Sequence, residues 1–509
     1  MFYAVHSFGL DGIDPYRVEV EVDSRKGLPG FDIVGLPDTA VKESRERVKS
    51  AIQNLGYPFP NAKVVANLAP ADTKKEGSVY DLAILLALIH ASGYERFHLE
   101  HTAVLGEISL NGELRGINGV LPMVLNASSL GITRVILPAA NAAEAAQAKG
   151  VEALTATHAR QVIQFLKNEG ALIPAHQLPT QSRSAGAPLP DLCDVRGQSE
   201  AKRAMEIAAA GFHNLLFIGP PGTGKSMMAK RLLSILPDMT WEEAVETTKI
   251  YSVKGALRQG EGLLNRRPFR SPHHTSSPVS IIGGGTPARP GDISLAHNGV
   301  LFLDELPEFP KSSLEALRQP LEDGVVNISR AKQRLSFPSR VMLVAAMNPC
   351  RCGNYGHPAK ACTCTPTALQ KYLGKVSGPL LDRMDLHVEV LPVDYGEISS
   401  TALQETSAQV RERVCAARLR QHRRYSGKGF FCNAQIPPSL LAESCPLEPA
   451  AAKLLQSAFH RLGLSGRGYE RILKVSRTIA DLDGADGIAS GHIAQAIQLR
   501  SLDRKYWGG

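Results

Sequence analysis

A glycine-rich segment with one lysine and one serine is the part of the sequence best suited to hold phosphate. Residues 219–226 read Gly-Pro-Pro-Gly-Thr-Gly-Lys-Ser, between an apolar run at 215–218 and a helical run at 227–233. Glycines let main-chain N–H groups turn toward phosphate oxygens, and the N-terminus of the following helix adds positive potential. This context predicts a phosphate-binding loop with Lys225 on the β- and γ-phosphates and Ser226 on Mg²⁺.

Two carboxylates follow a second apolar run, Val-Leu-Phe-Leu-Asp-Glu at residues 300–305. We expect Asp304 in the Mg²⁺ sphere, directly or through water, and Glu305 as the group that polarises the attacking water. Either motif alone has a structural alternative, a glycine turn or an acidic strand end, but both in this order predict hydrolysis of a nucleotide, with ATP and Mg²⁺. The predicted ligands of nucleotide and magnesium are Gly219, Pro220, Pro221, Gly222, Thr223, Gly224, Lys225, Ser226 and Asp304.

Four of the eight cysteines form two Cys-x-Cys pairs, Cys350 with Cys352 and Cys362 with Cys364. Four thiols over so short a loop can close a tetrahedral Zn²⁺ site without an open position, so we expect structural rather than catalytic zinc. His357, inside the loop, is an alternative for one thiol. A pair of disulfides is the competing interpretation, and an expected reducing cytosol argues against it.

The length and composition describe the molecule that must position these groups. A chain of 509 residues is too long for one ordinary core, and its 43% apolar and 21% charged fractions are typical of soluble globular proteins. The apolar run at 82–91 is too short to span a membrane, and no signal-peptide pattern is present, so we expect a cytoplasmic protein with no membrane partner. The net charge of +8 favours a polyanionic partner, although charge alone does not separate this from a solvated basic surface.

The order of predicted elements indicates an α/β fold. Residues 1–170 alternate strands and helices, with a strand at 16–22, a charged helix at 40–55, and a hairpin at 108–115 whose Asn-Gly suits a type I′ turn. Residues 171–190 are rich in proline and serine and read as a linker. Beyond it we expect αβ units over 191–393 and a helical domain over 394–509, with helices at 399–421, 450–462, 468–481 and 491–502.

Three further segments resemble AAA+ ATPases of the magnesium-chelatase-like group, and within it the ComM/YifB family. They are Pro-Phe-Arg-Ser-Pro-His-His-Thr at 268–275, Gly-Asp-Ile-Ser-Leu-Ala-His-Asn-Gly at 291–299, and Ser-Gly-Pro-Leu-Leu-Asp-Arg-Met-Asp at 377–385. The resemblance extends over essentially the whole chain. It implies an N-terminal Lon-protease-like α+β domain, a P-loop AAA+ αβα domain and a C-terminal helical lid. The implied activity is that of a homohexameric ring that drives branch migration of DNA junctions during natural transformation and recombination.

The resemblance also implies catalytic residues outside the phosphate loop. Asn348, which ends the apolar strand at 341–347, matches the sensor-1 group that orients the attacking water. Arg383 resembles an arginine finger that reaches the active site of the next subunit. The alternative for Arg383 is an ion pair with Asp382 or Asp385.

A further arginine, Arg467, resembles the sensor-2 residue at the start of a lid helix. Arg471 lies one helical turn away on the same face, so the sequence does not separate the two. The implied catalytic residues are Glu305, Asn348, Arg383 and Arg467.

Two insertions carry the predicted DNA contacts. Residues 250–290 interrupt the usual path after the phosphate-loop helix, and residues 325–340 alternate enough to form a hairpin, an element that related rings point into the pore. Basic side chains there would bind phosphates without reading sequence, and a solvated hairpin face is an alternative of near-equal weight. The predicted DNA-binding residues are Arg330, Lys332 and Arg334 in the hairpin and Arg266, Arg267 and Arg270 in the first insertion.

The Lon-like domain lacks the residues of a peptidase. Val79 stands where the resemblance puts the serine nucleophile, with Ser78 beside it, and Leu121 stands where the catalytic lysine belongs. Peptide hydrolysis then has no mechanism, so we expect a noncatalytic domain for assembly or DNA contact. An ATP-dependent protease is disfavoured for this reason. A chelatase-type motor acting on a protein partner remains the alternative to a DNA motor.

Overall fold

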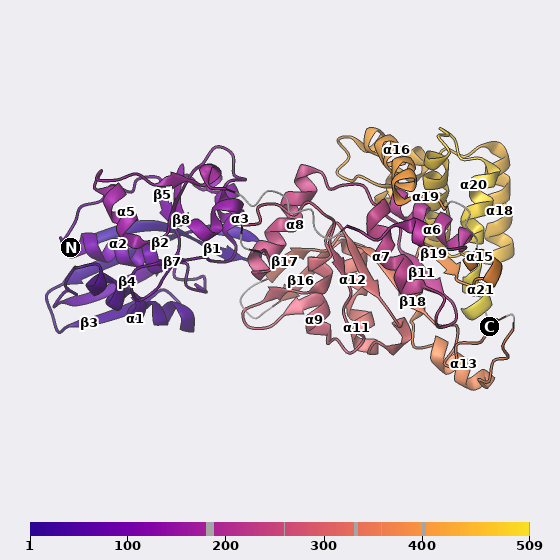
Figure 1. Ribbon diagram of the computed structural model, residues 1–509, viewed down its shortest axis with the longest axis horizontal. Helices are drawn as coiled ribbons and strands as arrows, with labels where there is room; N and C mark the ends of the chain where they lie inside the picture. Colours follow the sequence, from indigo (N-terminus) through magenta and orange to yellow (C-terminus); the bar gives the residue numbers. More distant parts are fainter. Residues whose placement is uncertain (180–187, 259, 330–333, 358, 400–403, 508–509) are drawn as a thin grey trace.

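The computed structural model describes residues 1–179, 188–258, 260–329, 334–357, 359–399 and 404–507. The molecule is elongated, with the N-terminal domain at one end, a parallel-sheet core in the middle, and a bundle of helices at the other end (Figure 1). This confirms the α/β class and the helical C-terminal region expected from the sequence.

One eight-stranded sheet organises the N-terminal domain, in the order β10-β9-β8-β5-β1-β2-β4-β3. Its centre is the antiparallel pair β1 (Phe2–Asp11) and β2 (Asp14–Arg25). Helix α2 (Asp81–Ala91) packs on this pair and has ten of its eleven residues buried, as predicted for the apolar run. The other elements are β3 (Gly30–Val34), α1 (Thr39–Asn54), β4 (Lys63–Ala69), β5 (Thr102–Val104), α3 (Val120–Leu125), β8 (Arg134–Pro138), α4 (Ala142–Ala145), β9 (Glu152–Ala156), α5 (Ala159–Leu166) and β10 (Ile173–Pro174).

Two local expectations for this domain need correction. The hairpin of β6 (Glu107–Ile108) and β7 (Leu114–Arg115) forms, but Ser109 N–H donates to the Glu113 carbonyl at 2.9 Å, which leaves a three-residue loop instead of a two-residue type I′ turn. The predicted linker also begins too early. Strand β10 pairs with β9 and completes the sheet, so residues 173–174 belong to the domain, while 180–187 lie outside the described residues.

The central domain is built on a five-stranded parallel sheet in the order β12-β15-β18-β11-β19. Its strands are short, apolar and mostly buried, as expected where helices cover both faces of a parallel sheet. Alternate residues of β11 point into two separate cores, Leu215 and Phe217 into one and Leu216 and Ile218 into the other. The strands are β11 (Leu215–Ile218), β12 (Phe269–Arg270), β15 (Val300–Leu303), β18 (Met342–Met347) and β19 (Leu386–Glu389).

Helices and the two insertions surround this sheet. The helices are α6 (Ser199–Gly211), α7 (Lys225–Ile235), α8 (Trp241–Lys254), α9 (Pro278–Ile282), α10 (Asp292–Leu295), α11 (Lys311–Ala316), α12 (Arg318–Asp323), α13 (Pro366–Leu373), α14 (Gly378–Leu381) and α15 (Tyr395–Ser399). The first insertion contains the small pair β13 (Gly283–Gly284) and β14 (Arg289–Pro290), and the second is the predicted hairpin of β16 (Val325–Ser329) and β17 (Arg334–Pro338). Helix α8 joins the domains, because the Ser252 carbonyl accepts the Gly119 N–H at 3.0 Å.

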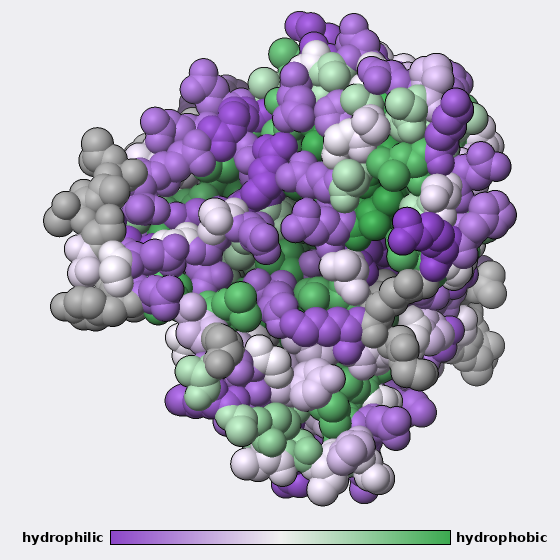
Figure 2. All heavy atoms as spheres, turned by 90° about the vertical axis from the view of Figure 1, so that its right-hand side faces the viewer, coloured by the Kyte–Doolittle hydropathy of each residue, from purple (hydrophilic) through white to green (hydrophobic). Residues whose placement is uncertain are grey.

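The C-terminal lid is helical, as expected. Its helices are α16 (Ser407–Tyr425), α17 (Leu441–Ser444), α18 (Pro449–Leu462), α19 (Gly466–Leu482), α20 (Ser490–Gln498) and α21 (Leu502–Trp507). Two of the predicted helices have other bounds: the one predicted from 399 begins at Ser407, and the one predicted to 502 ends at Gln498. The short helices α17 and α21 were not predicted. A buried hydrogen bond of 2.7 Å between His213 Nε2 and Thr478 Oγ1 ties the lid to the core. The face on the lid side is mostly hydrophilic, with smaller apolar areas in between (Figure 2). Among the described residues, none of the helices combines the length and apolarity needed to cross a bilayer.

Candidate nucleotide site

The phosphate loop lies between the end of β11 and the start of α7, as the sequence predicts. Gly222 and Gly224 have φ values of 81° and 86°, a left-handed conformation that glycine adopts without strain. A side chain at Gly219 would place its Cβ 2.1 Å from the carbonyl oxygen of Val390, so only glycine fits there. The main chain therefore wraps closely at the N-terminus of α7, where N–H groups are available to an anion.

Lys225 points back into this loop and is buried. Its Nζ donates to the carbonyls of Gly219 and Pro220, each at 2.7 Å, and to Asn348 Oδ1 at 3.1 Å. Burial lowers the pKa of Lys225 to about 8, although the charge of Asp304 acts in the opposite direction. The structure thus brings together the phosphate-loop lysine and the predicted sensor residue, and leaves the ammonium without a direct ion pair among the described residues.

The end of β15 completes the site with two carboxylates. Ser226 Oγ donates to Asp304 Oδ2 at 2.6 Å, which joins the two predicted magnesium ligands. Oxygen donors of this kind suit Mg²⁺. The next residue, Glu305, has a φ of 53°, and its carboxylate is more than half exposed. A left-handed non-glycine residue at this point aims the carboxylate away from the strand toward the loop that follows β12.

His274 contacts that carboxylate and was missed in the sequence. Its Nδ1 lies 3.2 Å from Glu305 Oε2, and its ring lies 4.1 Å from the ring of His273 between centroids. The two histidines are adjacent in the segment 268–275, and this His-His pair was a signal in the sequence that could have pointed to the site. Because an imidazole beside a carboxylate can hold the carboxylate in one orientation, we add His274 to the candidate site.

Arg383 lies at the other edge of the same sheet. Asn214, which precedes β11, donates from Nδ2 to the Arg383 carbonyl at 2.8 Å, whereas the phosphate loop follows β11. A four-residue strand separates the two edges by roughly 13 Å. The guanidinium is buried and pairs with Glu322, neither of the two aspartates considered from the sequence, and it also donates to the carbonyls of Arg318 and Pro379.

The structure separates the two lid arginines that the sequence left together. Arg467 Nη2 lies 3.2 Å from Glu322 Oε1, so Arg467 and Arg383 share one carboxylate. Arg471 instead pairs with the buried Asp385. Burial alone would raise the pKa of Asp385, but Arg471 and the neighbouring groups hold it well below its usual range. Arg383, Arg467 and Arg471 line one cavity of about 510 Å³, and no phosphate-loop residue is part of its lining.

The predicted DNA-binding arginines of the first insertion differ in their surroundings. Arg267 is buried, with its guanidinium on Glu243 at 2.7 Å and on the Asn298 carbonyl at 2.7 Å. It fixes the start of α8 and is not available to DNA, which corrects the expectation for this residue. Arg270 is partly exposed and pairs with Asp292 at 2.6 Å, and Arg266 is exposed.

The hairpin residues are only partly covered by the structure. Arg330 and Lys332 lie outside the described residues. The backbone of Arg334 pairs with Ser329 at the end of the ladder nearest the tip. Leu335, the next residue, lines a cavity with Gly12 of the N-terminal domain, so the hairpin lies on the side of the core that faces that domain (Figure 1).

The N-terminal domain has no peptidase geometry at the predicted position. Val79 and Leu121 are buried apolar side chains. The hydroxyl of Ser78, beside Val79, is bonded to the carboxylate of Glu107. A carboxylate partner does not supply the amine base that a serine–lysine peptidase needs.

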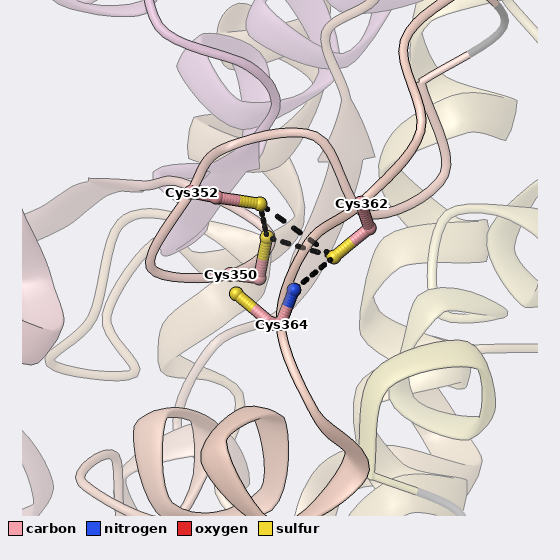
Figure 3. Close-up of side chains that lie close together, drawn as sticks. All are labelled: Cys350, Cys352, Cys362 and Cys364. Atoms are coloured by element: carbon pink, nitrogen blue, oxygen red, sulfur yellow. Dashed lines mark hydrogen bonds between the residues drawn. The ribbon is translucent and has the colours of Figure 1, made fainter.

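All four cysteines of the two Cys-x-Cys pairs meet beside the end of β18 (Figure 3). Their sulfur atoms lie within 4.8 Å of one another, as the zinc prediction requires. The loop that they close begins directly after Asn348, next to the phosphate loop.

Comparison with known proteins gives matches along the chain. The family described as magnesium chelatase, subunit ChlI, matches residues 191–398. Subunit ChlI of Mg-chelatase matches residues 20–141, and the C-terminal part of that subunit matches residues 404–500.

Several individual proteins are similar over nearly their full length. YifB of Escherichia coli K12 is 44% identical over 503 residues, which covers 98% of this chain and 97% of YifB. The competence protein ComM of Haemophilus influenzae is 44% identical over 509 residues, with the same coverage of 98% and 97%. The magnesium-chelatase 38 kDa subunit of Rhodobacter capsulatus is 23% identical over 63% of this chain and 89% of its own length.

Proposed function

This chain belongs to the magnesium-chelatase-like AAA+ family that includes ComM and YifB, and from this membership we propose that it is an ATP-driven ring motor that moves DNA junctions. Family membership supports ATP hydrolysis. The observation that supports a ring ATPase is the division of the predicted catalytic groups between two edges of one sheet. Lys225, Asp304 and Glu305 stand at one edge, and Arg383 stands at the other.

The phosphate-loop edge would bind the nucleotide. Lys225 would exchange its carbonyl partners for phosphate oxygens, and Ser226 with Asp304 would hold Mg²⁺, which screens the charge of the phosphates when bound. Glu305 would polarise the attacking water from a position set by His274. Asn348, already bonded to Lys225, would hold the water on the other side. All these groups lie at the carboxyl ends of neighbouring parallel strands, β11, β15 and β18.

Arg383 and Arg467 would serve a neighbouring subunit. Neither contacts the phosphate loop of its own chain, because both lie on Glu322 near the other end of β11 and line a cavity that contains no phosphate-loop residue. Side by side on Glu322, they form a cationic pair from two domains that would neutralise charge on a phosphoryl group presented by the next protomer. A closed ring, with a homohexamer as the expected state, gives every site such a neighbour.

DNA is the proposed substrate of the motor. The name of the Haemophilus relative links it to competence, and the net charge of +8 suits a polyanion. We place the contacts on the hairpin of β16 and β17, at Arg330, Lys332 and Arg334, with Arg266 and Arg270 as secondary candidates. Branch migration during transformation and recombination is the activity proposed.

A protein-remodelling motor is the second candidate. It rests on the similarity to the magnesium-chelatase subunit, which spans 89% of that protein. The net charge of +8 and the competence role named for the Haemophilus relative favour the first candidate.

A labelled four-way junction tests the proposal. Incubation with the protein, ATP and Mg²⁺ should convert the junction to two duplexes, and the Glu305→Gln variant should bind the junction without converting it. A protein that hydrolyses ATP but leaves junctions, forks and duplexes unchanged would favour the protein-remodelling alternative.

A further inference from the structure

The four clustered cysteines have a geometry that a single metal ion explains. The Sγ of Cys350 lies 3.3 Å from that of Cys352 and 3.7 Å from that of Cys362, and Cys352 and Cys362 are 3.6 Å apart. The Sγ of Cys364 completes the group (Figure 3). With a Zn–S bond of about 2.3 Å, the corners of a sulfur tetrahedron stand about 3.8 Å apart, close to these separations.

Other ways of using four cysteines fit less well. A disulfide needs two sulfurs about 2.05 Å apart and joins them two by two, whereas three Sγ atoms here are mutually close. An iron–sulfur cluster places several metal atoms between its cysteines and requires a wider cage than sulfurs that all lie within 4.8 Å. One tetrahedral ion without an open position is the arrangement that remains.

The surrounding main chain supports thiolate ligands. The Tyr355 N–H points at Cys350 Sγ at 3.3 Å, and the Cys364 N–H points at Cys362 Sγ at 3.4 Å. N–H donors of this kind stabilise metal-bound sulfur. His357 Nδ1 accepts the N–H groups of Ala359 and Lys360, and the four cysteines by themselves supply the four ligands of a closed tetrahedral site.

The metal loop touches both sides of the phosphate site. Cys350 is two residues after Asn348, whose Oδ1 accepts a hydrogen bond from Lys225 at 3.1 Å. Gly353, with a φ of 80°, lies against the phosphate loop so closely that a Cβ would come within 2.5 Å of Pro221 Cδ. One short loop therefore carries Asn348 at its start and contacts the phosphate loop at its turn.

We propose that Cys350, Cys352, Cys362 and Cys364 bind one Zn²⁺, and that this ion fixes the nucleotide site by holding Asn348 and Pro221 in place. Without the ion, the four cysteines no longer hold the two ends of the loop together. The distance between its two contacts with the phosphate site, at Asn348 and at Gly353, is then no longer fixed. The metal then supports ATP binding directly, because it positions residues of the nucleotide site. This inference rests on the nucleotide site of the proposed function.

The test begins with the full chain purified without a histidine tag. Elemental analysis should give about one zinc per chain, the number for one four-ligand site. The double variant Cys362→Ser/Cys364→Ser should lose the zinc, and its affinity for a fluorescent ATP analogue should fall several-fold. Cys415→Ser, an exposed cysteine on α16, is the matched control and should keep both zinc and affinity.

A second variant guards against a simple loss of folding. Gly353→Ala leaves all four thiols in place but crowds Pro221, so it should keep its zinc and still bind the analogue more weakly. Iron or no metal in the parent, or parental affinity in both the zinc-free variant and Gly353→Ala, would overturn the inference. Failure of the parent itself to bind ATP would instead count against the proposed function.

Discussion

At the scale of single residues, the chemistry depends on where charge is buried and what faces it. Lys225 is buried among carbonyl oxygens and an amide, with its ion pair left to an incoming phosphate. Arg383 is equally buried but already paired, on Glu322. Glu305 is exposed and held by His274. In the proposed function, the lysine binds phosphate, the carboxylate polarises water, and the arginine serves the site of a neighbouring subunit.

Lys225→Ala and Glu305→Gln should fail at different steps. In Lys225→Ala, the positive charge that would face the phosphates is lost, so ATP binding should weaken strongly. Loss of the Glu305 charge should leave binding intact and slow turnover by about 10²-fold or more. Nucleotide binding and steady-state ATPase assays on both variants measure the split, and near-normal turnover in either would contradict the assigned role.

ATP binding should also depend on pH through Lys225. Burial lowers the pKa of this ammonium to about 8, so the free protein loses the proton as the pH rises through that value. Bound phosphate favours the charged form, so binding near pH 8 should take up a proton, and affinity should fall at higher pH.

Calorimetry in two buffers of different ionisation enthalpy measures this uptake. The Lys225→Arg variant is the control, because its guanidinium stays protonated throughout this range. An affinity that does not change between pH 7 and about 9.5, with no proton uptake, would show that Lys225 is already fully charged in the free protein.

At the scale of elements, periodic segments were predictable and their connections were not. The strand–loop–helix around the phosphate loop, the buried helix α2 and the two lid helices α18 and α19 were predicted closely from the sequence. The short lid helices α17 and α21 were not. Nor was the position of β10, because a two-residue edge strand has no periodicity and its prolines read as a linker. The pairing of Arg467 with Glu322 and of His274 with Glu305 also escaped prediction, since each joins residues far apart in sequence.

The hairpin of β16 and β17 carries the DNA prediction. Neutralising Arg330, Lys332 and Arg334 together should weaken junction binding and junction movement in parallel, while the basal ATPase stays near the parental rate. For every cation that binds a DNA phosphate, its removal should reduce the slope of log affinity against log salt by about 0.9. Fluorescence anisotropy at several salt concentrations gives this slope directly.

A charge-matched control separates a specific contact from net charge. Arg423→Ala/Lys453→Ala/Arg461→Ala removes three exposed cations from the lid and should bind DNA almost as the parent does. If the hairpin variant forms normal assemblies and moves junctions at the parental rate, the hairpin is a solvated surface. Arg266 and Arg270 would then be the next residues to change.

At the scale of the whole molecule, the proposed function divides one active site between two subunits. The phosphate loop and Arg383 stand at opposite strand ends, and Arg467 from the lid joins Arg383 through Glu322. Both halves of this proposed site were found as motifs in the sequence, and the fold adds that they lie at opposite ends of β11 within one chain. Assembly is therefore a condition for hydrolysis in this account.

Mixing two inactive variants tests that division. Arg383→Ala lacks the finger and Glu305→Gln lacks the water-polarising carboxylate, yet a ring containing both has interfaces with an intact finger facing an intact Glu305. ATPase activity should reappear on mixing and pass through a maximum with composition. Mixed assemblies that form, as seen by native mass spectrometry, and remain inactive would refute action in trans.

The central claim, that ATP hydrolysis in this ring is coupled to DNA junctions, is tested most directly by one measurement. The steady-state ATPase rate is compared with no DNA, with linear duplex, and with a four-way junction of the same length and composition, at one fixed salt concentration. The account predicts that the junction stimulates hydrolysis more than linear duplex does, and that Glu305→Gln shows no stimulated rate. A parental ATPase rate that no DNA changes would contradict it.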